Sequence, residues 1–377
     1  MRKICYISGT RADFGIMRST LQSINDDKKL DLGVLVTGMH LLKKYGSTWK
    51  EINVNNLNII GKIKVQLSGS DGSEMSIAIG KQVIEFTKAL QANNPDILLL
   101  LGDRGEMLAG AIAAVHLNIP IVHIHGGELS GTIDESIRHS ITKLAHFHFT
   151  STENSRNRLI KMGEHPKNVF VTGAPGLDEI KNITLVDQQL LFNKYQLIQK
   201  KPYFLFLFHP VVQQITSIKK QIETIMKVLI KNNHQILILL PNSDSGSLII
   251  EKIVKKYAKK DRKIQIVVHA PRIDFLSLIA YADVFVGNSS SGIIEATTLG
   301  TPVLNLGSRQ KFRERNLNII DSEISSESIK NGLIECQKMQ NKSWNNCYGN
   351  GNSSSKIVNL LKNLSLDSNI LEKVNAY

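Results

Sequence analysis

The sequence has few cysteines, few aromatic residues and no long hydrophobic run, and each shortage excludes a class of protein. Its 377 residues include only three cysteines, Cys5, Cys336 and Cys347, and no two of them have CxxC spacing. This set argues against a disulfide framework or a zinc cluster and fits a reducing compartment. No apolar run approaches the roughly 20 residues that a membrane helix requires, and the N-terminal MRKICYISG does not resemble a signal peptide. We therefore expect a cytoplasmic protein without membrane contact.

Positive charge is in excess, with a formal net charge of +13, but it is spread along the chain. Lysines occur in separated pairs, without a long basic tail or a recognisable nucleic-acid-binding module. Aromatic residues make up only 6%, which weakens a stacking surface for single strands. We expect no nucleic acid partner, while the excess charge fits an anionic small substrate.

Short β-branched runs alternate with helical stretches along most of the chain. The runs are almost continuously apolar, which is typical of parallel strands buried on both faces. The alternation predicts right-handed βαβ units and an α/β fold. The expected strands span residues 3–8, 33–37, 97–101, 119–124, 147–151 and 169–172 in a first set, and 203–208, 235–240, 264–268, 283–286 and 302–305 in a second.

The two sets of strands predict two Rossmann-like domains that face each other across a cleft. We expect a first domain over residues 1–175, a linker over 176–202 and a second domain over 203–360. The helical tail over 361–377 has no strand left to pair with, so we expect it to pack back on the first domain. Ligands of open parallel sheets bind at the carboxyl ends of the strands, and these ends are therefore where we look for chemistry.

Two strand ends of the first domain carry an arginine near an acidic residue. The first is Gly9-Thr10-Arg11-Ala12-Asp13, where Arg11 and a helix start can bind an anion, although on this motif alone an ordinary strand–helix turn is favoured. The second is Asp103-Arg104, where the aspartate can act as a base and the arginine can hold a phosphate. The alternative for this pair is a helix cap with a salt bridge.

The segment 123–139 concentrates titratable groups, with three histidines, three carboxylates and one arginine in 17 residues. A loop with a purely structural role seldom has this composition, so we favour a functional site that includes Glu128. Its Gly-Gly pair leaves room for a ligand to approach the backbone. His123 lies two residues from the next histidine, but no third ligand has a recognisable spacing, so we expect no metal. Asp134 and Arg138 share a helix face and could equally form a surface ion pair.

The strand ends of the second domain are also rich in polar residues. His209 follows the first strand of this domain, and Asn242 comes shortly after the second. The Gly/Ser-rich turn 287–292 can cradle a diphosphate with its amides and hydroxyls. Glu295 can then accept hydrogen bonds from a ribose diol, and Arg309 follows a further strand. A core histidine and a serine helix cap are the alternatives, but polar groups at four strand ends of one domain favour a binding site.

Six motifs occur in order between the first strand and about residue 315: GTRADFG, LLGDRGEMLAGA, HIHGGELSGTIDESIRHSITKLAH, FHP, GNSSSGIIE and TPVLNLGSRQ. Together they resemble the UDP-N-acetylglucosamine 2-epimerase family, and specifically its hydrolysing branch, which acts in the synthesis of sialic-acid-type sugars. The GGELSG stretch favours this branch over the nonhydrolysing one. The resemblance implies a two-domain fold of the glycosyltransferase-B type, with no cofactor and no metal in the chemistry.

The resemblance also implies roles for individual residues. A UDP-sugar is the implied substrate, and we expect a homo-oligomer, either a dimer or a tetramer. Many relatives carry Glu where this chain has His125. By motif position the UDP-binding residues are Arg11, Asn242, Ser289, Ser290, Glu295 and Arg309, and the residues for catalysis or sugar binding are Asp103, Glu128, Asp134 and His209, with Arg104 and Arg138 alongside.

The implied reaction is elimination of UDP to a 2-acetamidoglucal, followed by hydration to the free manno sugar. Departure of UDP from C1 acidifies the C2 hydrogen, which a carboxylate removes, and a proton later returns to C2 from the opposite face. Such a reaction requires one acid and one base near neutral pH. We expect the closeness of Asp103, Glu128 and Asp134 to raise the pKa of at least one of them.

The sugar is either N-acetylglucosamine or a 2,4-diacetamido-6-deoxy analogue, which lead to sialic and legionaminic acid respectively. Two other function classes stay open. A UDP-sugar glycosyltransferase can have the same fold, because a fold does not determine a reaction. A noncatalytic nucleotide-binding protein would not need the carboxylate-rich segment 123–139.

Overall fold

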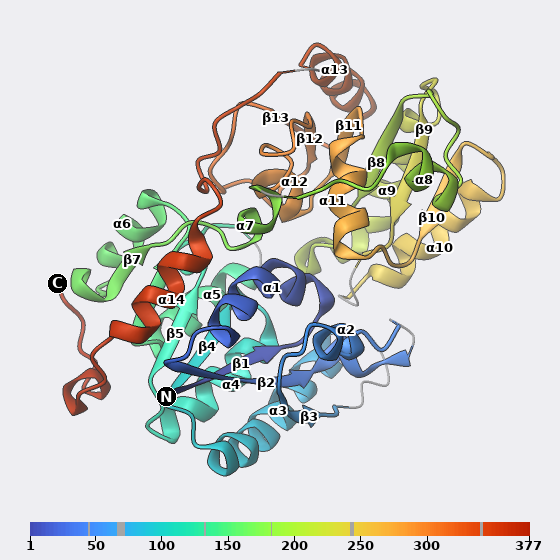
Figure 1. The fold of residues 1–377 in the computed structure, drawn as a ribbon. Coiled ribbons are helices and arrows are strands. Elements are labelled where there is room, and N and C mark those ends of the chain that lie inside the picture. Colours follow the sequence, from blue (N-terminus) through green and yellow to red (C-terminus); the bar gives the residue numbers. More distant parts are fainter. Residues whose placement is uncertain (44–45, 66–71, 132, 182, 242–244, 340–341) are drawn as a thin grey trace.

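The fold consists of two parallel β-sheets, each covered by helices (Figure 1). The computed structural model describes residues 1–377 except 44–45, 66–71, 132, 182, 242–244 and 340–341. The first sheet has seven strands in the order β3-β2-β1-β4-β5-β6-β7, and the second has six in the order β10-β9-β8-β11-β12-β13. The predicted α/β fold with two Rossmann-like sheets is therefore confirmed.

The elements alternate along the chain as βαβ units require. The strands are β1 (Arg2–Ser8), β2 (Leu30–Thr37), β3 (Ile59–Ile63), β4 (Ile97–Leu101), β5 (Ile121–Ile124), β6 (Phe147–Thr150), β7 (Val169–Val171), β8 (Tyr203–Leu207), β9 (Gln235–Leu239), β10 (Ile264–Val267), β11 (Val284–Gly287), β12 (Val303–Leu306) and β13 (Ile319–Ser322). The α-helices are α1 (Arg11–Asn25), α2 (Trp49–Val54), α3 (Gly72–Asn93), α4 (Gly105–His116), α5 (Ile133–Leu144), α6 (Glu153–Lys161), α7 (Gly176–Lys181), α8 (Gln188–Lys194), α9 (Ile218–Leu229), α10 (Ser247–Ala258), α11 (Arg272–Ala280), α12 (Ser290–Ile294), α13 (Ser326–Gln337) and α14 (Ser353–Asn363).

Two observed strands, β3 and β13, have no counterpart among the predicted ones, and both lie at a sheet edge. In β3 only Ile63 is fully buried, and Lys62 is exposed. In β13 only Ser322 is fully buried, and Asp321 is exposed. An edge strand pairs on one side and is covered less than a central one, so it lacks the continuous apolar run on which the prediction depended.

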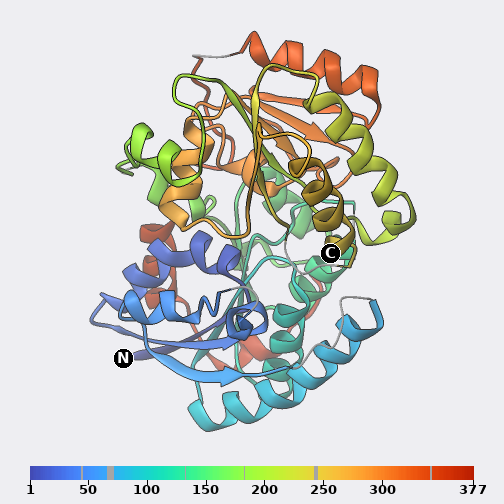
Figure 2. The ribbon, with the colours of Figure 1, turned by 90° about the vertical axis from the view of Figure 1, so that its right-hand side faces the viewer.

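The C-terminal part of the chain returns to the first domain (Figure 2). Val358 and Leu361 of α14 share a hydrophobic core with Phe14 and Met17 of α1. Beyond this helix, the Lys373 ammonium lies 2.6 Å from the Glu164 carboxylate, which is buried. Within the described part of the chain, no helix is both long and apolar enough to cross a membrane.

Candidate active site

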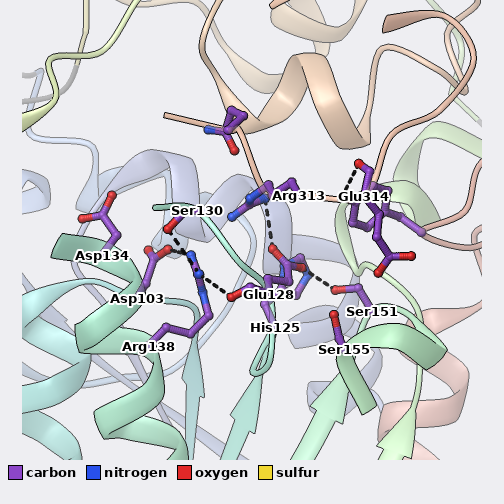
Figure 3. Close-up of polar contacts among 12 residues, drawn as sticks. Asp103, His125, Glu128, Ser130, Asp134, Arg138, Ser151, Ser155, Arg313 and Glu314 are labelled. Carbon is purple, nitrogen blue, oxygen red and sulfur yellow. Dashed lines mark hydrogen bonds and ion pairs between the residues drawn. The ribbon is translucent and has the colours of Figure 1, made fainter. Parts of the chain in front are cut away.

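Several predicted site residues follow the carboxyl ends of strands, with Asp103 after β4 and Glu128 after β5 in the first sheet. Figure 3 shows these two with Asp134 and Arg138 of α5, beside Arg313 of the second domain. A pocket between the domains is lined by Thr10, Arg11, Ala12, Met39 and Thr48 from the first domain and by Leu240, Pro241 and Val268 from the second. Arg11, the first residue of α1, therefore lies between the domains, where an anion could reach it. Asn242 follows this pocket in sequence but is outside the described residues.

The turn before α1 is held by the buried carboxylate of Asp13. This carboxylate accepts hydrogen bonds from the backbone N–H groups of Gly9 at 3.0 Å and Thr10 at 2.6 Å. The Thr10 hydroxyl in return accepts from the Asp13 N–H at 3.2 Å, which completes a capping box. Asp13 thus fixes the loop, and Arg11 is the group of this motif that is suited to binding an anion.

Asp103 and Glu128 are joined through the buried guanidinium of Arg138 (Figure 3). Asp103 follows β4 after Gly102, whose φ of +78° is readily adopted only by glycine. Arg138, on α5, contacts the Asp103 carboxylate and donates to the backbone oxygen of Glu128 at 2.8 Å. Its side chain is 1% exposed. Arg138 is therefore part of the buried site rather than of a surface ion pair.

The Glu128 carboxylate is buried and has partners from three directions. One oxygen, Oε1, accepts from the Ser151 hydroxyl at 2.7 Å and lies 3.0 Å from Nδ1 of His125. The other oxygen, Oε2, lies 3.0 Å from Nη1 of Arg313. Arg313 belongs to the loop between β12 and β13, so this contact links the second domain to the first.

Cations determine the ionisation of these two carboxyl groups. Burial alone would raise both pKa values, but Arg138 and Arg313 hold the pKa of Asp103 below its ordinary value. In the same way, Arg313 and His125 hold the pKa of Glu128 well below its ordinary value. The expected rise is not found at either group, because arginines from both domains outweigh the effect of burial. Both are ionised at neutral pH.

Asp134, at the start of α5, faces a cation from the second domain. Its Oδ2 lies 3.7 Å from Nη2 of Arg309, which also donates to the backbone oxygen of Asn288 at 3.1 Å. The Asn288 side chain accepts from the backbone N–H of His209 at 2.6 Å and donates to its backbone oxygen at 2.8 Å. The structure therefore connects Asp134, Arg309 and His209 through Asn288.

The Gly/Ser-rich turn places Ser289 and Ser290 at the start of α12. The Ser289 hydroxyl caps this helix by accepting from the Ser291 N–H at 3.3 Å. Glu295 follows the helix, and its Oε1 contacts the guanidinium of Arg272. Its Oε2 is buried and accepts no hydrogen bond from any described residue. A hydroxyl donor from a ligand would satisfy that oxygen, as the predicted ribose contact requires.

His123 and Arg104, which the sequence analysis also singled out, make contacts within the first domain. Nε2 of His123 lies 2.7 Å from the backbone oxygen of Gly102, and its Nδ1 lies 3.1 Å from the Thr142 hydroxyl. Burial lowers the pKa of His123 to about 3, so the imidazole is neutral and serves the fold. Arg104 pairs with Glu106 at 3.1 Å. The described residues include no group of three His, Cys, Asp or Glu side chains suited to holding a metal ion.

Neighbouring parts of the domain fill the space beside Gly126 and Gly127. A Cβ added to Gly127 would lie 2.4 Å from the backbone oxygen of Ser155 in α6. One added to Gly126 would lie 3.1 Å from the ring of His123 and from the hydroxyl of Thr142. The close approach predicted for this pair is therefore made by the domain's own packing.

Arg313 and Arg272 are functional candidates that the sequence prediction missed. Both are cations from the second domain, and both contact a carboxylate that the prediction had singled out. The signal for Arg313 was present, since the run Ser308–Arg315 is rich in arginine and follows a strand end. The sequence does not show which arginine of such a loop turns back toward the other domain.

Comparison with known proteins agrees with this geometry. The family model described as UDP-N-acetylglucosamine 2-epimerase matches residues 22–362. A protein of Legionella pneumophila named "UDP-N,N'-diacetylbacillosamine 2-epimerase (hydrolyzing)" is 45% identical over 377 residues, which is 100% of both chains. A protein of Campylobacter jejuni named "GDP/UDP-N,N'-diacetylbacillosamine 2-epimerase (hydrolyzing)" is 37% identical and covers 86% of this chain and 85% of its own length.

The fold has solved counterparts as well. The UDP-GlcNAc 2-epimerase of Neisseria meningitidis superposes with a TM-score of 0.80 at 20% identity, over 96% of this chain and all of that one. This likeness confirms the predicted glycosyltransferase-B type of fold. With a family model that spans most of its length and a relative that matches it from end to end, the chain belongs to the UDP-N-acetylglucosamine 2-epimerase family.

Proposed function

We propose that this enzyme is a hydrolysing 2-epimerase that converts UDP-N,N'-diacetylbacillosamine to UDP and the free 2-epimeric sugar. The observation that carries the proposal is the full-length relative at 45% identity, whose name states this substrate and the hydrolysing reaction. A further relative is named for polysialic acid biosynthesis. The product would therefore supply a synthesis of the sialic-acid type, and with this sugar it would lead toward legionaminic acid.

The ionised carboxylates and the interdomain arginines fit the chemistry of elimination followed by hydration. UDP must leave C1 with the electron pair of the C1–O bond, which cations at the cleft would stabilise. We assign this role to Arg11, which lines the pocket between the domains, and to Arg309, which faces Asp134. Asp103 is ionised and can accept or hold a proton near the sugar. Asp134 lies across from Arg309, so sugar and diphosphate would meet between these two elements.

UDP would lie mainly on the second domain, with its ribose on Glu295. We expect Glu295→Ala to weaken UDP binding by about 1–3 kcal/mol, the usual loss for a hydrogen bond to a charged group. Titration calorimetry with UDP measures this. Glu179→Gln is the matched control, because Glu179 also contacts Arg272, at 3.3 Å, without belonging to the predicted ribose site. Equal UDP affinity in the wild type and in Glu295→Ala would show that Glu295 does not bind the ribose.

Phe312 supports the choice of a 6-deoxy sugar. Its side chain is 54% exposed, although it is large and apolar and precedes the buried Arg313. Its ring lies against the loop that carries Glu128, since a Cβ added to Gly131 would approach it to 3.0 Å. An apolar surface at this point would favour a C6 methyl group over the hydroxymethyl group of N-acetylglucosamine.

The wild type should therefore prefer the UDP-diacetylbacillosamine substrate over UDP-N-acetylglucosamine by about 10–200-fold in kcat/KM, the discrimination that a hydrophobic contact can supply. Phe312→Ser should reduce this ratio, and Phe312→Leu should retain most of it. Initial rates of UDP release with each substrate give the ratio. A ratio that Phe312→Ser leaves unchanged would contradict the role of this side chain but not the reaction.

We further propose a cytoplasmic homo-oligomer, either a dimer or a tetramer. Ile77 and Ile84 lie seven residues apart on one face of α3 and are 54% and 57% exposed, as expected of a helix face that a second copy covers. Sedimentation equilibrium measures the assembly, and a monomer at micromolar concentration would contradict this proposal.

A further inference from the structure

His125 lies directly after β5 in a left-handed backbone conformation. Its φ is +64°, in the left-handed region that residues other than glycine seldom occupy. The backbone N–H of His125 donates to the Phe149 oxygen at 3.0 Å, which ties this residue to the end of β6. Such a conformation persists where its surroundings hold it, and such conformations cluster at functional sites.

Glu128 fixes one side of the His125 ring. Its Oε1 lies 3.0 Å from Nδ1, and His125 and Glu128 are 7% and 3% exposed. The carboxylate is itself held by the Ser151 hydroxyl and by Arg313. A buried, ionised carboxylate at Nδ1 favours the tautomer that carries its hydrogen there, which leaves the lone pair on Nε2.

The other ring nitrogen of His125, Nε2, differs from Nδ1 in its surroundings. Nε2 is buried and makes no hydrogen bond to any described residue. Buried polar atoms of proteins are almost always hydrogen-bonded, so an exception at a candidate site requires an explanation. Glu128, which lies against His125, also accepts from Arg138 through its backbone oxygen, and Arg138 in turn contacts the Asp103 carboxylate. A bound substrate is the partner that this position suits.

We propose that Nε2 of His125 is the base that removes the C2 proton of the sugar and that Glu128 is its positioning residue; this rests on the proposed function. The proton moves from C2 to Nε2, the electrons of the C2–H bond form the C1=C2 double bond, and UDP leaves with the electrons of the C1–O bond. Water then adds to C1 and loses a proton, while an acid on the opposite face protonates C2. Ionised Glu128 stabilises the imidazolium formed in the first step.

This assignment changes the role of Glu128. The sequence places it among the residues for catalysis, but its two oxygens are occupied by His125, Ser151 and Arg313. A carboxylate held in this way is suited to orienting an imidazole rather than to exchanging protons with a sugar. Arg313 comes from the second domain, so the orientation of His125 depends on contact between the domains.

The test uses His125→Gly, because glycine adopts a φ of +64° without strain and the variant should therefore fold. We expect kcat on the UDP-diacetylbacillosamine substrate to fall about 10²–10⁴-fold, the usual contribution of a general base, with UDP affinity unchanged. Added imidazole should restore part of the rate. His116→Gln, on α4 and outside the site, should behave as the wild type. Glu128→Gln should lower kcat with little change in KM.

The outcomes separate this inference from the proposed function. A wild type without hydrolysing epimerase activity would refute the proposed function. An active wild type together with a His125→Gly variant within fivefold of its kcat would overturn the role of His125. If the His125→Gly variant is slow and added imidazole does not restore its rate, the role of His125 as the base would also be overturned. The loss of kcat would then have a cause other than the missing imidazole. An unchanged kcat in the Glu128→Gln variant would show that Glu128 does not position His125.

Discussion

Replacing Asp103 by Asn is expected to lower kcat by about a thousandfold, within the range that a single acid or base contributes. Asn keeps the size of the side chain but removes its charge, so the buried guanidinium of Arg138 loses its ionised partner. Breaking a buried ion pair from one side typically costs about 3–5 kcal/mol of folding stability. UDP affinity should stay near that of the wild type, because the proposed UDP site lies chiefly on the other domain.

Three measurements test this prediction: kcat by UDP release, UDP affinity by calorimetry and the free energy of unfolding by urea titration. The matched control is Asp96→Asn, which alters a carboxylate just before the same strand, at its opposite end. Asp96 accepts from the backbone N–H of Lys3 at 2.7 Å and lies on the surface. Turnover of Asp103→Asn close to that of Asp96→Asn would show that the carboxylate at the end of β4 takes no part in catalysis.

Replacing Arg313 by Gln should have an effect of similar size through a different route. Arg313 is 9% exposed and reaches Glu128, which is 3% exposed, so the variant leaves a buried carboxylate without its main cation. We expect a loss of about 3–5 kcal/mol in folding stability and a fall in kcat, since the contact between the domains is weakened. Arg315→Gln is the control, because Arg315 pairs with Asp321 inside the second domain, where such exposed pairs contribute little.

The same substitution should change how stability depends on pH. The pKa of Glu128 lies below its ordinary value because of Arg313 and His125, in spite of burial, so its ion pairs stabilise the fold above the unfolded pKa. This stabilisation is lost as the pH falls toward the folded pKa. Without Arg313 the folded pKa rises, so acid should unfold Arg313→Gln at a higher pH than the wild type. Identical acid unfolding curves would show that Arg313 does not determine the charge state of Glu128.

The central strands and their polar ends could be predicted from the sequence because both depend on local patterns. Apolar runs such as Ile97–Leu101 identify strands buried on both faces, and Asp103 follows from the rule that ligands bind at strand ends. The edge strands β3 and β13 carry no such run. They form because the neighbouring strand offers hydrogen bonds, which a single stretch of sequence does not reveal.

The sequence predicted which residues belong to the site better than it predicted which residues contact them. The motifs indicated Asp103, Glu128 and Arg138, and the structure joins these three. The pKa directions could not be predicted, because they depend on Arg313, which is 185 residues from Glu128 in sequence and meets it only when the two domains pack together. Tertiary structure determines which charges from separate domains meet, and the sequence of this loop does not show that Arg313 reaches the first domain as Arg309 does.

Incubation of the wild type with the UDP-diacetylbacillosamine substrate alone, in deuterated water, tests the central claim most directly. We predict release of UDP without any added acceptor, together with a free sugar that is inverted at C2 and carries deuterium there, because the C2 proton is supplied by an exchangeable acid. Deuterium at C2 is read by mass spectrometry and its configuration by NMR. A released sugar that retains its original C2 hydrogen, or no release until an acceptor is added, would contradict elimination followed by hydration.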